Sequence, residues 1–478
     1  MTPVDRREIQ EIVRRVRRRY AAEDASVAVP PAGEGDQGYG VFDEVDDAVR
    51  EAGVAFESFQ TLGLDARVKI IDSVRAAMVG SARELAQMAH RETGLGRAED
   101  KEVKNLLVTR KTPGPEDLAP AARTGDQGMT VTEYAPFGVI AAITPTTNPT
   151  ATLINNAIAT ISAGNAVVFN AHPAAKSCSA ETVHRINRAI LAAGGPLNLA
   201  TTVREPTIAS AQELMHHQGV RILLVTGGPG VVKEALKTDK RAITAGPGNP
   251  PVVVDESADV ERAAREIVRG ASFDNNMVCT DEKEVLVVAS RADELLRAFG
   301  RQRAVVLNEY QTGQIAKVVF EEPGAPGQPG RINRRWVGKN AGTILREIGI
   351  QASDDVRLAV AEVPVEHSLV WTEQMMPVMP VARVRTFDEA IDVAVRAEHQ
   401  FRHTASIYSN NVDHITRMAR AMNVSIFVAN AANLAGLGEG GEDFTSYSIA
   451  TPTGEGLTRP RTFSRIRRLT VAGSLRIV

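Results

Sequence analysis

The stretch PFGVIAAITPTTNPTATLINNAIATISAGNAVVFN, residues 136–170, places two strands on either side of a helix. The apolar runs at 137–144 and 165–170 predict buried strands. The segment between them predicts a helix, with Asn148 at its N-cap and Gly164 at its end. A strand, helix and strand of this length form a right-handed crossover between parallel strands. The stretch therefore predicts an α/β fold with a parallel sheet.

The same alternation continues along the chain. Further helices and strands are predicted over 174–195, 220–226, 228–236, 260–269, 283–288 and 292–299. A second α/β unit starts after 245–255, and an apolar tail strand over 469–478 lacks a local partner. A chain of 478 residues is too long for one hydrophobic core, so we expect at least two lobes.

The composition excludes several classes of protein. The formal charge is 55 − 58 = −3, so no field of the whole chain attracts nucleic acid or an anionic membrane. The two cysteines cannot form a disulfide framework, which indicates a reducing compartment. No apolar run approaches the ~18 residues of a membrane span, and no secretory leader is evident.

The first twenty residues differ from the rest of the chain. Residues 1–20 predict an amphipathic helix with seven arginines and three acidic residues, followed by a flexible linker over 21–41. A frayed terminal helix, a membrane-binding or nucleic-acid-binding helix and a mitochondrial transit peptide share this pattern. The acidic residues and the absence of serine argue against a transit peptide. We favour a helix that docks on a protein partner.

A cysteine with polar neighbours is the first candidate for chemistry. Cys279 lies in DNNMVCTDEK, residues 274–283, whereas a structural cysteine is normally surrounded by apolar side chains. Cys178 lies among small residues of a predicted helix, so we expect it only to pack. We therefore interpret Cys279 as a nucleophile.

Other motifs are weaker. No P-loop is present, and VTGGPGVV, residues 225–232, is the nearest glycine cluster that could hold a phosphate through backbone amides. His399 and His403 have helical i,i+4 spacing but lack a third ligand, so no metal site is predicted. His172, Cys178 and His184 are too far apart in sequence for a standard zinc site.

Several motifs occur together in the order found in aldehyde dehydrogenases. They are PFGVIAAITPTTNP (136–149), AGNAVVFN (163–170), VTGG (225–228), NNMVC (275–279) and TEQMMPVMPV (372–381). TPGPEDL (112–118), NAHPAAK (170–176) and IATPTGEGLTRPRTFSRIRR (449–468) resemble the branch that acylates coenzyme A. The chain is most similar to the propionaldehyde and acetaldehyde dehydrogenases of bacterial microcompartments.

The resemblance implies a Rossmann-type cofactor domain, an α/β catalytic domain and a small β oligomerisation element. We expect the domain that binds NAD and coenzyme A over 42–250, with an oligomerisation hairpin near 123–136. The catalytic domain is expected over 251–440. Residues 441–478 would return to the cofactor domain and supply C-terminal oligomerisation strands.

The resemblance also implies roles for individual residues. Cys279 would attack the aldehyde, form a thiohemiacetal and then, after hydride transfer, a thioester. The Asn148 side-chain amide and the Cys279 backbone N–H would stabilise the oxyanion. Glu373 would hold the nicotinamide ribose. The implied cofactor-binding residues are Thr144, Pro145, Thr146, Asn170, His172, Pro173, Thr226, Gly227, Gly228, Gly246 and Glu373.

Two departures from hydrolytic aldehyde dehydrogenases predict the product and the cofactor. Thr244 occupies the position of the glutamate that activates water, and a threonine hydroxyl is no general base near neutral pH. A thiol attacks a thioester far better than unactivated water does, so coenzyme A should take the acyl group. Asn170 replaces a lysine suited to a 2′-phosphate, which favours NAD over NADP.

We therefore predict an NAD-dependent oxidation of a short-chain aldehyde, with propanal as the expected substrate, to its acyl-CoA. The alternatives are a hydrolytic enzyme that recruits Asp274 or Glu282 as its base, and a non-catalytic scaffold. The resemblance implies a bacterial cytoplasmic enzyme inside a microcompartment. Residues 4–20 would dock on a shell or core protein, and the enzyme would be a dimer or tetramer.

Overall fold

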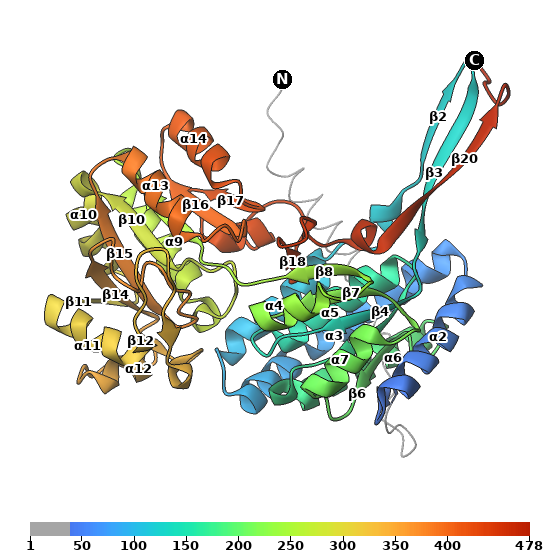
Figure 1. Cartoon of the computed structure of the whole chain (residues 1–478), viewed down its shortest axis with the longest axis horizontal. Helices are drawn as coiled ribbons and strands as arrows, with labels where there is room; N and C mark the ends of the chain where they lie inside the picture. Colours follow the sequence, from blue (N-terminus) through green and yellow to red (C-terminus); the bar gives the residue numbers. More distant parts are fainter. Residues whose placement is uncertain (1–38) are drawn as a thin grey trace, which may run out of the picture. The chain divides into compact units, whose positions relative to one another are not determined.

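Two parallel sheets, each covered by helices, form most of the structure (Figure 1). The computed structural model describes residues 39–478, so the predicted docking helix lies outside the described residues, as does most of the linker. The strand orders are β1-β6-β5-β4-β7-β8 in the first sheet and β11-β14-β15-β10-β9-β16-β17 in the second. All pairs in both sheets are parallel, which confirms the predicted α/β class.

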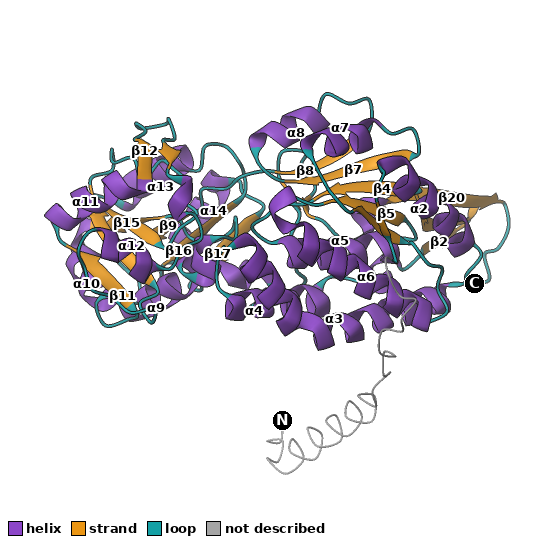
Figure 2. Cartoon of the chain, turned by 90° about the horizontal axis from the view of Figure 1, so that it is seen from below, coloured by secondary structure: helices purple, strands orange, loops and turns teal. Residues whose placement is uncertain are grey.

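The six-stranded sheet contains the stretch that opened the sequence analysis. Its strands are β1 (Val41–Phe42), β4 (Val139–Ile143), β5 (Ala166–Asn170), β6 (Ala200–Val203), β7 (Val220–Thr226) and β8 (Arg241–Ala245). Its helices are α2 (Val45–Gln60), α3 (Leu64–Thr93), α4 (Ala98–Lys111), α5 (Pro149–Ser162), α6 (Lys176–Ala192), α7 (Ile208–His216) and α8 (Pro229–Ala235). Helices lie on both faces of the sheet (Figure 2), so β4 and β5 are buried at every position and, except for Asn170 at the end of β5, are apolar rather than alternating.

The seven-stranded sheet follows directly after β8. Its strands are β9 (Pro251–Val254), β10 (Glu284–Val288), β11 (Ala304–Leu307), β14 (Leu358–Val363), β15 (Val378–Val384), β16 (Thr404–Tyr408) and β17 (Ile426–Ala429). Its helices are α9 (Val260–Ala271), α10 (Ala289–Phe299), α11 (Glu309–Val319), α12 (Ala341–Glu347), α13 (Phe387–Ala397) and α14 (Val412–Met422). Two short antiparallel pairs lie outside the two parallel sheets: β12 (Phe320–Glu322) with β13 (Arg331–Ile332), and β18 (Ile449–Ala450) with β19 (Gly456–Leu457).

A third, antiparallel sheet extends from the rest of the fold as a narrow ribbon (Figure 1). It consists of β2 (Ala121–Gly125), β3 (Gly128–Pro136) and β20 (Ser464–Ala472), with β3 in the centre. The tail strand predicted over 469–478 was placed too late, because β20 already begins at Ser464 and ends at Ala472. Its partner is β3 of the same chain, more than three hundred residues earlier. Pairing over that separation leaves no local signal in the sequence.

The last forty residues also contribute to the hydrophobic core around the six-stranded sheet. Tyr447, Ile449 and Phe463 are buried in the same apolar cluster as β4 and β5. The segment after β17 therefore returns to the six-stranded sheet before β20 begins.

Candidate active site

The carboxyl edge of the six-stranded sheet gathers most of the predicted cofactor-binding residues. The chain leaves β4 toward β5 on one side, and later places β7 on the other side of β4. Such a reversal opens a crevice at the carboxyl ends of the strands, where ligands bind in open α/β sheets. The residues that follow these strands are Thr144, Pro145 and Thr146 after β4, Asn170, His172 and Pro173 after β5, Thr226, Gly227 and Gly228 around the end of β7, and Gly246 after β8.

A groove of about 380 Å³ lies beside the same edge. It is lined by Val232 of α8, by Leu236 at the C-cap of this helix, by Gly246, and by Phe401 and Pro452 from later segments. Lys233 of α8 and Lys237 just after the helix also line it, and Lys237 forms an ion pair with Glu234 at 2.6 Å. Apolar walls beside a lysine are typical of sites for a phosphorylated ring, so the groove is a candidate site for part of a nucleotide.

The glycine cluster differs from expectation in one respect. The Gly227 N–H is not free for a phosphate, because it donates to the Ala245 carbonyl at 3.1 Å. Gly228 is the N-cap of α8 and precedes Pro229, which has no N–H. The Thr226 hydroxyl lies 2.6 Å from the Ser448 hydroxyl. Gly228 therefore offers the one backbone N–H of this glycine pair that could face a phosphate.

Asn170 and His172 are tied to neighbouring protein groups. Asn170 is buried, and its Oδ1 accepts a hydrogen bond of 2.7 Å from the Ser210 hydroxyl. The Asn170 side-chain amide is therefore bound to the first turn of α7 and is not free on its oxygen side. His172 is exposed, and its Nδ1 accepts from the Ala174 N–H at 3.2 Å.

Cys279 lies in a tightly held turn between α9 and β10. Asp274, Asn275 and Asn276 before it all have left-handed backbone angles, with φ of 45°, 57° and 65°. Asparagine and aspartate tolerate this conformation best among residues with a side chain. Lys283 is buried beneath the turn, and its Nζ donates to Asn276 O, Asn276 Oδ1 and Val278 O at 3.0, 2.7 and 3.3 Å. These bonds fix the backbone of the segment that ends at Cys279.

The Cys279 thiol is half-buried and strongly protonated. Burial, followed by the nearby negative charge of Glu373, raises its pKa to about 12, against the lowering effect of Lys283. Cys178 is fully buried in α6, and its Sγ lies 3.4 Å from the Ala175 carbonyl, as a packing cysteine would. Burial raises the pKa of the Cys178 thiol as well. Only Cys279 therefore combines some exposure with polar surroundings.

Asn148 occupies the N-cap position of α5 but does not cap the helix with its side chain. Its Oδ1 instead accepts a hydrogen bond of 2.5 Å from Lys104 Nζ. Its Nδ2 lies 3.1 Å from the Thr147 hydroxyl, which leaves a second amide hydrogen for another acceptor. The side chain is thus available as the oxyanion donor that the sequence suggested.

Glu373, Gly248 and His403 lie close to the cysteine. The Glu373 carboxylate accepts from the Gly248 N–H, and burial raises its pKa. A Cβ on Gly248 would meet the Cys279 carbonyl at 2.7 Å and the His403 ring at 3.0 Å, so these groups pack together. His403 is buried with an unpaired Nε2, and burial lowers its pKa to about 4. A neutral imidazole therefore stands beside the cysteine turn.

The candidate bases of a hydrolytic enzyme are poorly suited to that role. Thr244 is fully buried and its hydroxyl has no hydrogen-bond partner. Asp274 forms ion pairs with Lys101 and Lys104, and these keep its pKa low despite burial. Glu282 accepts from the Asn433 N–H at 2.8 Å and lies against Gly270 of α9. Burial raises the pKa of Glu282 to about 7, in the range of a general base, but the side chain is fully buried and packed against α9, which leaves no room for an attacking water.

His399 and His403, for which the sequence predicts no metal site, form hydrogen bonds within the protein. His399 Nε2 lies 2.9 Å from the Trp371 carbonyl, and His403 Nδ1 lies 2.9 Å from the Thr404 hydroxyl. Between residues 39 and 478, one group of three potential ligands occurs, Asp255, Glu256 and His414. Asp255 there already accepts from serine hydroxyls and contacts His414 at 2.8 Å.

The sequence analysis gave no role to two residues of the site, Lys104 and Lys283, and it considered His403 only as a metal ligand. Lys104 and Lys101 share one helical face with Val108, which turns inward. That spacing was a usable signal of burial, although charged residues are almost always assigned to the surface. Lys283 and His403 carried no comparable pattern. In the part of the chain that the structure describes, no helix is long and apolar enough to cross a membrane.

Comparisons with known proteins identify the family of the chain. The sequence profile of the aldehyde dehydrogenase family matches residues 39–308 and 358–442. The acetaldehyde dehydrogenase (acetylating) EutE of Salmonella typhimurium is 49% identical over 440 residues, 92% of this chain and 94% of that protein.

Two solved structures are similar over most of the chain. A propionaldehyde dehydrogenase from the fucose utilisation bacterial microcompartment of Clostridium phytofermentans is 43% identical, with a TM-score of 0.88 over 92% of this chain and 100% of that one. A Rhodopseudomonas palustris propionaldehyde dehydrogenase, solved with bound coenzyme A and an acylated cysteine, is 43% identical, with a TM-score of 0.88 over 92% of this chain and 99% of that one.

Proposed function

Because this chain belongs to the aldehyde dehydrogenase family, we propose that it oxidises a short-chain aldehyde and transfers the acyl group to coenzyme A. It is an enzyme of the coenzyme-A-acylating kind, like its relatives of 49% and 43% identity. The acetylating relative and the propionaldehyde dehydrogenases indicate a substrate of two or three carbons. Propanal, predicted from the sequence, lies within that range.

Cys279 is the proposed nucleophile, and its thiolate adds to the aldehyde carbonyl. The carbonyl oxygen then carries negative charge and needs donors that are already in place. The Asn148 Nδ2–H and the Cys279 backbone N–H are the proposed donors. Lys104 supports this role of Asn148, because a lysine ammonium can only donate and therefore fixes Oδ1 toward itself.

The acyl group leaves Cys279 by exchange with the thiol of coenzyme A. The observation that carries this step is Thr244, which is buried and whose hydroxyl has no partner. The resemblance to hydrolytic aldehyde dehydrogenases implies that those enzymes have a glutamate at this position. Asp274 and Glu282 are both engaged elsewhere, so neither supports the free-acid alternative. The relative with coenzyme A and an acylated cysteine supports the same exchange.

The cofactor is proposed to be NAD, bound along the carboxyl edge of the six-stranded sheet. A nicotinamide dinucleotide would supply the hydride acceptor. The groove beside α8, with Lys233 at its wall, would hold part of this dinucleotide. Neutral Asn170 supports NAD over NADP, and Glu373 is proposed to hold the nicotinamide ribose. Thr144, Pro145 and Thr146 would line the same crevice.

The setting is proposed from the relatives and from two parts of the chain. The Clostridium phytofermentans relative belongs to a bacterial microcompartment, so we assign this enzyme to such a compartment in a bacterial cytoplasm. Residues 4–20 would dock on a shell or core protein. The ribbon β2-β3-β20 exposes Ile466 and Leu469, which are 65% and 63% exposed, and would build a dimer or tetramer.

Product identification tests the function. The purified enzyme is mixed with NAD and aldehydes of two to four carbons, with and without coenzyme A, and the products are identified by mass spectrometry. We expect acyl-CoA and NADH, with the highest kcat/KM for two or three carbons, and slow turnover without coenzyme A. Rapid release of carboxylic acid without coenzyme A would refute the acylating reaction. Replacing NAD by NADP tests the cofactor assignment, and Cys279→Ala should abolish NADH formation.

A further inference from the structure

A buried chain of hydrogen bonds joins the Asn148 amide to the loop that carries Cys279. Lys104 Nζ donates to Asn148 Oδ1 at 2.5 Å and also to Asp274 Oδ2. The side chains of Lys104 and Asp274 are only 1% and 0% exposed. Asn148 follows β4 in the first sheet, whereas Asp274 belongs to the turn before Cys279. Lys104 is therefore the link between the two segments that would supply the oxyanion donors.

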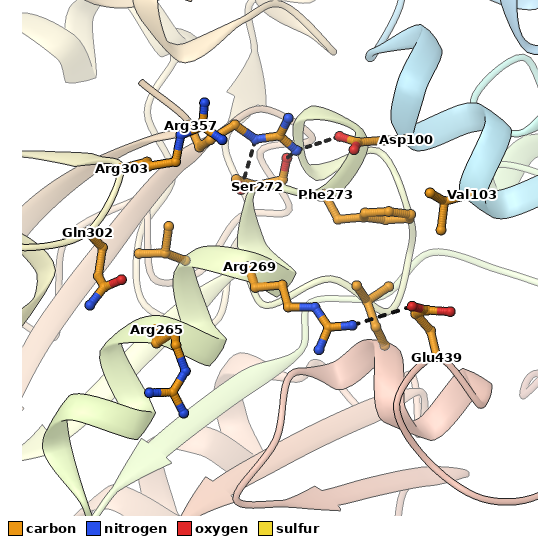
Figure 3. Close-up of a pocket in the computed structure, with 12 residues that line it drawn as sticks. Asp100, Val103, Arg265, Arg269, Ser272, Phe273, Gln302, Arg303, Arg357 and Glu439 are labelled. Atoms are coloured by element: carbon orange, nitrogen blue, oxygen red, sulfur yellow. Dashed lines mark hydrogen bonds and ion pairs between the residues drawn. The ribbon is translucent and has the colours of Figure 1, made fainter. Parts of the chain in front are cut away.

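The outer end of this network is firmly anchored. The Asp274 N–H donates to Asp100 Oδ2 at 2.9 Å, and Asp274 Oδ1 accepts from the Arg97 N–H at 2.7 Å. Arg357 also donates to Asp100 and reaches the Ser272 carbonyl at 3.0 Å, at the wall of a pocket of about 380 Å³ (Figure 3). These bonds hold Asp274 in its left-handed conformation, so its carboxylate is a fixed point for Lys104.

The network carries an excess of positive charge at the amide oxygen. Lys101 Nζ donates to the same Asp274 Oδ2 at 2.9 Å and to the Thr147 carbonyl at 3.3 Å. Burial lowers the pKa of Lys104 to about 8, so its ammonium form predominates at neutral pH. In that form two ammonium groups face one carboxylate. Lys104 directs its remaining charge at Asn148 Oδ1, which polarises the amide and makes its N–H a stronger donor. Lys101 is equally buried and also pairs with Asp274, but it makes no hydrogen bond to the Asn148 side-chain amide.

We propose that Lys104 is a positioning residue that aims and polarises the Asn148 side-chain amide toward the oxyanion formed at Cys279. This proposal rests on the proposed function, since it assumes that Asn148 is an oxyanion donor. It assigns Lys104 no contact with substrate. Its effect is therefore confined to steps in which a carbonyl oxygen becomes negative.

The test compares Lys104→Met with Lys101→Met. Each variant removes one buried ammonium group of α4 that pairs with Asp274, so the two substitutions should have similar effects on folding. Loss of an oxyanion donor typically lowers kcat about 10²–10³-fold. We expect a loss of that order for Lys104→Met and less than about tenfold for Lys101→Met, measured as NADH formation at saturating aldehyde. Equal losses in the two variants would overturn the proposal.

Two further readouts separate positioning from general damage. Alkylation of Cys279 by iodoacetamide forms no oxyanion, so its rate should stay within about threefold in Lys104→Met while NADH formation falls. In an Asn148→Ala background, Lys104→Met should have little further effect on kcat, because both changes remove the same donor. A fully additive double variant, or an alkylation rate that falls as much as kcat, would refute the role.

The conservative variant Lys104→Gln guards against misfolding. Glutamine can still donate one hydrogen bond to Asn148 Oδ1, so Lys104→Gln should recover part of the kcat that Lys104→Met loses. If Lys104→Met does not fold, the loss of kcat is compared between Lys104→Gln and Lys101→Gln instead. A wild type that produces no acyl-CoA would refute the proposed function itself. An active wild type with an unaffected Lys104→Met would refute the positioning role alone.

Discussion

Substituting Glu373 by glutamine should make Cys279 more reactive toward alkylating reagents. Burial and the Glu373 charge raise the thiol pKa to about 12, so the ionised fraction at pH 8 is about 10⁻⁴, since 8 − 12 = −4. An ordinary cysteine with a pKa near 8.5 is about one quarter ionised at that pH. The thiolate of Cys279 should therefore be about 10³-fold scarcer than that of a free cysteine.

The rate difference should be smaller than the difference in thiolate. A thiolate of higher pKa is intrinsically more nucleophilic, with a Brønsted slope of about 0.4–0.5, which recovers about 10^1.5. Wild-type Cys279 should thus react roughly 10²-fold more slowly than a free thiol at pH 8. Removing the negative charge of Glu373 lowers the pKa of Cys279, and each tenfold gain in thiolate should raise the rate about threefold.

The assay is the rate of iodoacetamide alkylation between pH 7 and 10.5, followed by mass spectrometry of the peptide that contains Cys279. A Cys178→Ser background removes the second thiol. Lys283→Met should act in the opposite direction, because Lys283 lowers the pKa of Cys279. Glu366→Gln, on an exposed residue, serves as the matched control. A wild-type midpoint near pH 8.5, or a slower reaction in Glu373→Gln, would refute this account of the thiol.

Three further predictions concern other parts of the chain. Thr244→Glu should lower the free energy of unfolding by at least about 1–3 kcal/mol, because the fully buried site would be overpacked. Thr244→Val should be close to neutral, because the Thr244 hydroxyl has no partner. Thermal unfolding of both variants measures the difference, and equal stability of the two would contradict the prediction. Aspartate at both Ile466 and Leu469 should give smaller assemblies in light scattering with unchanged secondary structure, and an unchanged mass would exclude the ribbon as an interface. Deletion of residues 1–20 should leave solution kinetics intact but disperse a fluorescently tagged enzyme through the cytoplasm, and an unchanged distribution would count against a docking helix.

Much of the fold could be predicted because its signals are local. The apolar run VIAAI (139–143) and the helix after Asn148 are set by the spacing of neighbouring residues, and the structure contains both. The polar surroundings of Cys279 and the motif order predicted the family, which the comparisons bear out. The packing role of Cys178 among small residues was equally visible, and the buried α6 confirms it.

The sequence by itself determined the order of strands and helices, the family and the candidate nucleophile, because each depends on residues that are adjacent or regularly spaced. Only the tertiary structure decided how the site is tuned. It buried Lys104 and Lys283, paired the Gly227 amide with Ala245, and joined β20 to β3. Burial, charge and pairing at these positions come from segments separated by tens to hundreds of residues. Apart from the helical spacing that places Lys104 on the inner face of α4, local patterns carry no record of such contacts, since they form only when the two sheets and the ribbon are assembled.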